Sequence, residues 1–191
     1  KKQNNIIIIL YKRIIMILHY LKNKENKDKK ISSTIYLQII KETNKICNDI
    51  FSNNKKDFNI VFEVSSILLI VFFIALNKNK KIDSYYYKQE LIALFIRDID
   101  YSLRIEGISD MKIGKYVKLY VKKFYFRIPI LEKVFLNNNH KLLSNYLAKF
   151  GLFLEENNSD NTIFFYSYLQ DLINKIQKLK KNDFRNFDFF K

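Results

Sequence analysis

Cysteine, glycine and proline are scarce in this chain of 191 residues, which has one Cys, three Gly and one Pro. The single cysteine, Cys47, excludes a disulfide scaffold and a zinc site with several cysteines, and it fits a reducing compartment. So little glycine and proline argues against a β-rich fold built on tight turns and against a glycine-rich phosphate loop. No stretch alternates polar and apolar residues with the period of a half-buried strand. These absences favour an all-α protein.

Catalytic signatures are also missing. His19 and His140 stand outside any metal-ligand spacing, and the chain has no GxSxG, P-loop, GxGxxG or cysteine-pair motif. The best acid–base candidates are Asp98 and Asp100, but residues two apart on a helix point in different directions and do not share a proton. We therefore expect no enzyme and no metal centre, although binding of a metal by scattered carboxylates stays open.

Apolar residues are abundant, at 48% of the chain, and aromatic residues make up 16%. This composition excludes an intrinsically disordered protein, and the length suits one domain that buries a core without disulfides. The formal net charge is +15, with 29 Lys but only 5 Arg. Part of that charge reflects AT-rich codon usage, since Ile, Lys, Asn, Phe and Tyr account for 109 residues. The remainder favours anionic partners, namely nucleic acid, the ribosome or a membrane surface.

The first 30 residues are interpreted separately from the rest. Residues 6–21 are apolar but interrupted by Lys12 and Arg13, which makes them too short for a confident transmembrane span. They fit extraneous sequence before a start at Met16, a membrane-surface anchor or an ordinary packed helix. Residues 22–30 are highly charged and indicate a linker. We expect an N-terminal extension over 1–30, a helical domain over 31–180 and a basic aromatic tail over 181–191.

Helical periodicity dominates the predicted domain. A stripe containing Ile35, Ile39, Ile46 and Ile50 predicts a first helix, with Cys47 buried beside it and Ser32, Ser33 or Thr34 as its cap. Residues 60–76 are apolar on all sides, which is typical of a core helix or a membrane span, and we favour the core. The expected fold is a single-domain bundle of about six or seven helices around this central helix.

The later helices are predicted at 85–106, 110–127, 143–154 and 160–179. Gly107 is expected at the C′ position of the first of these, and Ser109 or Asp110 at the start of the second. Pro129 is expected to stop that second helix. Asp160 or Asn161 is expected to cap the last.

One face of the helix after Gly107 is strongly basic. It carries Lys112, Lys115, Lys118, Lys122 and Lys123, with Arg127 following. A solvated face needs no function, whereas the functional alternative is an electrostatic footprint for RNA phosphates or anionic lipid. Interleaved aromatic residues can stack on bases, but at these spacings several of them must face the core.

A specific ordered set of residues runs from Asp98 to Arg127. It resembles the signature of the ubiquinol–cytochrome c chaperone family, D-M-D-x-x-L-R-E-M-G-V-G-D-L-x-V-G-K followed by a basic stretch and F-Y-G-R. Departures occur at Ile99, Ile105-Glu106, Ser109 and Phe126, and upstream Phe62-Glu63 resembles the family's F-E pair. The likeness covers residues 31–136 well and the C-terminal helices weakly. The matching residues are Asp98, Asp100, Leu103, Arg104, Gly107, Asp110, Gly114, Lys115, Phe124, Tyr125 and Arg127.

The resemblance implies a non-catalytic helical assembly factor for the cytochrome bc1 complex. Its implied partners are newly made cytochrome b, a small partner protein, and the ribosome or an anionic membrane surface. It implies no cofactor and no small-molecule substrate, and a place in the bacterial cytoplasm or mitochondrial matrix, peripheral to the inner membrane. We expect Asp98, Asp100, Arg104, Gly107 and Asp110 to form a structural corner that presents a polar partner surface. The alternatives are a basic RNA- or ribosome-binding module and a membrane protein that uses residues 6–21 and 60–76 as spans.

Overall fold

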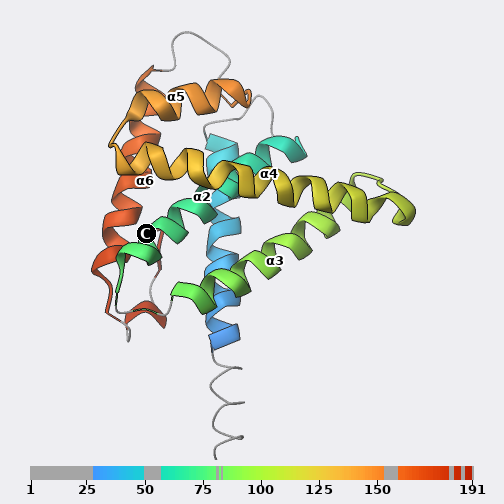
Figure 1. The fold of residues 1–191 in the computed structure, drawn as a ribbon, viewed down its shortest axis with the longest axis horizontal. Helices are drawn as coiled ribbons and strands as arrows, with labels where there is room; N and C mark the ends of the chain where they lie inside the picture. Colours follow the sequence, from blue (N-terminus) through green and yellow to red (C-terminus); the bar gives the residue numbers. More distant parts are fainter. Residues whose placement is uncertain are drawn as a thin grey trace, which may run out of the picture.

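The computed structural model describes residues 28–49, 57–80, 82, 84–152, 159–180, 183–185 and 188–190. These residues form six α-helices and one short 3-10 turn, with no strand among them, which confirms the predicted all-α domain (Figure 1). The first of these is described over residues 28–49 and is called the N-terminal helix. The others are α2 (Phe58–Lys78), α3 (Ser84–Ile105), α4 (Asp110–Leu136), α5 (His140–Lys149) and α6 (Ser159–Lys178), followed by η2 (Asp183–Arg185).

Helix α2 is the centre of the core. Its residues are buried almost without interruption from Phe62 to Leu76, because α3, α4 and α6 all pack against it. By length and apolar composition it is the one helix in the described part of the chain that could cross a membrane. The surrounding helices cover it, as predicted for a core helix. Its end is fastened to α6 by Asn79, whose side-chain amide donates to the carbonyls of Ile176 (2.9 Å) and Leu179 (3.0 Å).

Helices α3 and α4 form a hairpin around Gly107. This glycine has φ +84°, in the left-handed region that residues with a Cβ avoid. The Ile108 amide donates to the Leu103 carbonyl and the Gly107 amide donates to that of Arg104, each at 3.0 Å. This pair of bonds is the Schellman motif, so the predicted C′ role of Gly107 is confirmed. Ser109 occupies the N-cap position of α4 through its backbone carbonyl and makes no side-chain cap bond.

The prediction that Pro129 ends α4 is wrong. The helix continues to Leu136 with Pro129 inside it. Proline removes one backbone hydrogen bond and crowds the preceding turn, at a cost of about 3 kcal/mol in a helix interior. The following turns bury Leu131, Val134 and Phe135 completely or nearly so, and this burial outweighs the loss.

The predicted boundaries of the domain also need correction. Residues 28–30 are helical, so the expected linker does not extend to residue 30. Ser32, Ser33 and Thr34 are therefore not caps, and each hydroxyl donates to the carbonyl four residues earlier within the helix. Buried positions on this helix include Ile35, Ile39, Ile46 and Cys47, as predicted. Residues 1–27, with His19, and Ile50 lie outside the described residues.

The C-terminal tail contributes to the core. Phe184 and Phe189 are buried, and the Phe189 ring meets the Phe72 ring of α2 edge-on at 5.1 Å between centroids. A boundary between domain and tail at residue 180 therefore separates side chains that pack together. The predicted core stripe of Phe165, Leu169, Leu172 and Ile176 in α6, with Leu179 just after its end, is buried. The predicted caps Asp160 and Asn161 lie within the first turn of that helix, and Leu154 lies outside the described residues.

Candidate functional site

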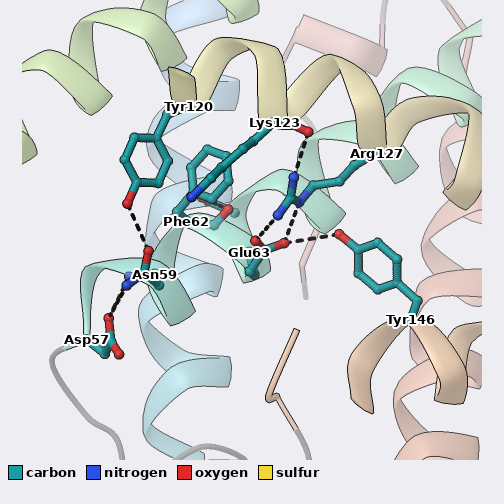
Figure 2. Close-up of polar contacts among 9 residues, drawn as sticks. Asp57, Asn59, Phe62, Glu63, Tyr120, Lys123, Arg127 and Tyr146 are labelled. Atoms are coloured by element: carbon teal, nitrogen blue, oxygen red, sulfur yellow. Dashed lines mark hydrogen bonds and ion pairs between the residues drawn. The ribbon is translucent and has the colours of Figure 1, made fainter. Parts of the chain in front are cut away.

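Arg127 of α4 reaches into the core and pairs with Glu63 of α2 (Figure 2). Its Nε donates to Glu63 Oε2 at 2.6 Å, and its Nη2 pairs with Glu63 Oε1. The remaining nitrogen, Nη1, donates to the Lys123 carbonyl at 2.7 Å. Tyr146 of α5 donates its hydroxyl to Glu63 Oε2 at 3.1 Å. This Glu63–Arg127–Tyr146 cluster therefore joins three helices that are far apart in the sequence.

The cluster is removed from solvent. Arg127 is 3% exposed and Glu63 6% exposed. The guanidinium carbon lies 4.3 Å from the ring centroid of Phe150, so an aromatic ring covers the ion pair. Burial, and then the Glu63 charge, raise the pKa of the Tyr146 hydroxyl, which remains a proton donor. The cluster is a structural clamp without an open side, and the placement of Arg127 on the exposed basic face was wrong.

A second polar contact extends the seam between α2 and α4. The Tyr120 hydroxyl donates to Asn59 Oδ1 at 2.8 Å, and the backbone amide of Asn59 donates to the N-cap carboxylate of Asp57 at 2.8 Å (Figure 2). The Lys123 ammonium lies 4.2 Å above the centre of the Tyr120 ring. Burial raises the pKa of Tyr120, helped by the charge of Asp57. These contacts fix the rotation of α4, and with it the direction of its outer face.

The acidic residues before Gly107 have separate partners. Asp98 accepts the Tyr36 hydroxyl of the N-terminal helix at 2.8 Å. Asp100 accepts Arg104 Nε at 2.7 Å, and Arg104 also pairs with Asp110 across the turn. Because the carboxylates point to different neighbours, Asp98 and Asp100 do not form an acid–base pair. Asp100, Arg104 and Asp110 form a polar bridge over the α3–α4 turn, whereas Asp98 is bonded to the N-terminal helix instead. A role of these residues in partner binding stays a prediction.

The other motif residues divide between core and surface. Leu103 and Phe124 are buried in the core, whereas Gly114 lies exposed within α4. The lysines predicted for the basic face are exposed, except that Lys123 is half-buried over Tyr120. Tyr125 and the neighbouring Phe126 are also exposed. The exposed lysines are Lys112, Lys115, Lys118 and Lys122.

Conventional reactive groups are not assembled in the described part of the chain. No group of three or more His, Cys, Asp or Glu side chains there is placed to hold a metal ion. Cys47 is buried, which raises its pKa to about 11 and keeps the thiol protonated.

A cavity of about 350 Å³ lies between α5 and α6, lined by His140, Lys141, Ser144, Asn145, Thr162 and Ile163.

The comparisons with known proteins agree with the motif. The sequence model of the family described as "Ubiquinol-cytochrome C chaperone" matches residues 52–188. This chain belongs to the ubiquinol–cytochrome c chaperone family. Membership supports a chaperone role in assembly of the cytochrome bc1 complex, and it suggests a protein that is not an enzyme. The matched residues include both Glu63 and Arg127, which pair with each other in the core.

A solved structure shows the same fold. The crystal structure of the Cbp3 homolog from Brucella abortus superposes with a TM-score of 0.71, covering 88% of this chain and 92% of that one at 17% identity. No curated protein matches the chain by sequence.

Sequence reasoning missed Tyr146 as a partner of Glu63. The available signal was Glu63 itself, because a lone carboxylate in an apolar helix needs buried partners.

Proposed function

We propose that this chaperone acts on newly made cytochrome b and that the outer face of α4 holds it at an anionic surface where cytochrome b is produced or inserted. The outer face is defined as Lys112, Lys115, Lys118, Leu119, Lys122, Tyr125 and Phe126. All of these side chains are exposed. The proposed location is the bacterial cytoplasm or the mitochondrial matrix, peripheral to the inner membrane.

The charge of this face carries the proposal. No acidic residue occurs between Met111 and Leu131. The one arginine in that stretch, Arg127, is neutralised by Glu63 inside the core, so the lysines supply the external charge. Each lysine near an anionic membrane surface contributes about 1 kcal/mol of attraction, and ribosomal phosphates attract such a face in the same way.

Exposed apolar side chains on the same face suit a client that is itself apolar. Leu119, Tyr125 and Phe126 lie among the lysines and are all exposed. Cytochrome b is a membrane protein with several spans, and its new helices need shielding from water. A lysine and aromatic face bound beside the site of insertion places a chaperone where those helices emerge.

A charge-reversal variant tests the contact. Replacing Lys112, Lys115, Lys118 and Lys122 with Glu should abolish co-sedimentation with ribosomes or anionic liposomes at low salt while leaving helicity unchanged. The matched control replaces four other exposed lysines with Glu and so changes the net charge by the same amount. These lysines are Lys41, Lys141, Lys149 and Lys178. Binding that survives reversal of the α4 lysines, or falls equally in both variants, contradicts the proposal.

Deletion of the gene tests the client. Cells that lack this chain should lose cytochrome b and assembled bc1 complex, and the α4 charge-reversal variant should restore them poorly. The control lysine variant should restore them fully. Normal bc1 levels in the deletion strain would overturn the assembly role itself.

A further inference from the structure

The α3–α4 turn presents two large apolar side chains to solvent. Ile105, the last residue of α3, is 68% exposed, and Met111, in the first turn of α4, is 98% exposed. One turn earlier on α3, Tyr101 is also exposed. Figure 1 shows the turn at the end of the hairpin away from α6. These apolar side chains are therefore exposed at the tip of the hairpin.

The turn is held firmly in place. The Schellman bonds at Gly107 fix its backbone, and Arg104 bridges Asp100 on α3 to Asp110 on α4. Leu103 and Ile113, just inside the turn, are buried in the core. Apolar side chains on such a support lose little backbone freedom when they are buried in a partner.

Positive charge begins at the turn and runs along α4. Lys112 and Lys115 lie in the two turns of helix next to Met111, and Lys118 follows. Two acidic residues flank the turn. Asp110 is paired with Arg104, whereas Glu106 has no ion pair in the described part of the chain. Apolar side chains at a tip with lysines behind them match the depth profile of a bilayer, which has acyl chains below anionic headgroups.

We infer that the α3–α4 turn inserts Ile105 and Met111 into the interfacial region of an anionic lipid bilayer, with Lys112, Lys115 and Lys118 against the headgroups. RNA phosphates would attract the lysines but would leave two exposed aliphatic side chains in water. Tyr101 is placed for the headgroup level, where tyrosine is enriched in membrane proteins. The inference rests on the proposed function and selects lipid as the anionic surface.

A tryptophan placed at the tip tests insertion directly, because the chain contains no tryptophan of its own. In Met111→Trp, addition of vesicles of phosphatidylcholine with phosphatidylglycerol should shift the emission to the blue, and brominated acyl chains should quench it. The control is Leu136→Trp, at the other end of α4, where the native side chain is also exposed. Its emission should not change. Equal responses at both positions, or none at Met111, overturn the inference.

Apolar-to-polar variants test the energetic contribution. Ile105→Ser with Met111→Ser should lower the partition coefficient for anionic vesicles about tenfold or more, because each side chain loses its burial in lipid. Leu136→Ser should bind like the wild type. Glu106→Gln, in the same turn, should bind as tightly as the wild type or more tightly. If Glu106→Gln weakens binding as much as the serine variant, a disturbed turn explains the loss and insertion is refuted.

Separate outcomes distinguish this inference from the proposed function. If the tip variants bind vesicles normally but the deletion strain lacks bc1 complex, the insertion is wrong and the chaperone role stands. If the protein binds ribosomes and ignores anionic vesicles, the lysines serve RNA and the insertion is wrong. If tip variants lose vesicle binding while the deletion strain has normal bc1 levels, the membrane contact stands and the proposed client is wrong.

Discussion

Glu63 and Arg127 allow a quantitative test of how this core is held together. In Arg127→Met the side chain keeps an unbranched apolar stem but loses every hydrogen bond to Glu63 and to the Lys123 carbonyl. The Glu63 carboxylate is then left 6% exposed, with Tyr146 as its remaining partner in the cluster. Removing one member of a buried ion pair costs about 3–5 kcal/mol. For a protein of this size that corresponds to a fall in melting temperature of roughly 6–20 °C.

The double variant separates the interaction from the burial of charge. Glu63→Leu alone leaves the Arg127 cation buried without its partner and should cost a similar amount. Glu63→Leu with Arg127→Met removes both charges from the core, and such replacements are often neutral in free energy. The double variant should therefore be more stable than either single variant. It should still be about 1–3 kcal/mol less stable than the wild type, because the Tyr146 hydroxyl loses its acceptor.

Urea-induced unfolding followed by far-UV circular dichroism measures all four free energies of unfolding. The coupling energy from the double-mutant cycle should be several kcal/mol. If the double variant loses the sum of the two single losses, Glu63 and Arg127 do not depend on each other. A loss of less than about 1 kcal/mol in either single variant would lie well below the cost of breaking a buried ion pair. Such a result would mean that water reaches the cluster and that the clamp is not closed.

Three further predictions concern other positions. Gly107→Val should lower stability by about 1–2 kcal/mol, because the φ of Gly107 is positive. Gly114→Ala, inside α4 with open space around it, should raise stability by about 0.5–1 kcal/mol. Equal melting temperatures for Gly107→Val and the wild type would contradict the first expectation. Pro129→Ala should restore a helical hydrogen bond and raise the free energy of unfolding by about 1–3 kcal/mol; a loss would show that proline acts mainly by stiffening the unfolded chain. Burial raises the pKa of Cys47 from 9.0 to about 11, so the folded protein should resist thiol alkylation at neutral pH. Because the unfolded thiol ionises first, its contribution to stability is complete below pH 9.0 and is lost as pH rises towards about 11, and Cys47→Ala should lack this part of the loss.

Local patterns were sufficient for most helices. The apolar run 60–76 predicted a central helix because no polar side was left to face water, and α2 is buried on all sides. Gly107 predicted a helix end because only a residue without Cβ takes its φ readily, and the backbone bonds there are those of the Schellman motif. Both inferences concern neighbours within a few residues, where the sequence pattern and the structure share the same geometry.

Positions that depend on distant packing were predicted less well. Pro129 stops a helix in isolation, but the burial of Leu131, Val134 and Phe135 carries α4 past it. The sequence predicts a basic aromatic tail separate from the domain, yet Phe184 and Phe189 pack against Phe72. In each case an apolar surface about a hundred residues away or on another helix supplies the free energy that the local pattern lacks.

Arg127 shows most clearly what the sequence by itself determined and what the tertiary structure decided. The sequence determined the all-α class, the core helix, the lysine face and the chaperone family motif, because all of these follow from composition, periodicity and short ordered sets of residues. The sequence analysis grouped Arg127 with the lysines because of its charge, although its spacing from Tyr120 and Phe124 continues the buried stripe of α4. Only the tertiary structure brought Glu63 beside it, 64 residues away, with Tyr146 as a further donor. A buried carboxylate needs charge and hydrogen bonds in a medium of low dielectric constant, and the partners that supply them are chosen by the packing of three helices.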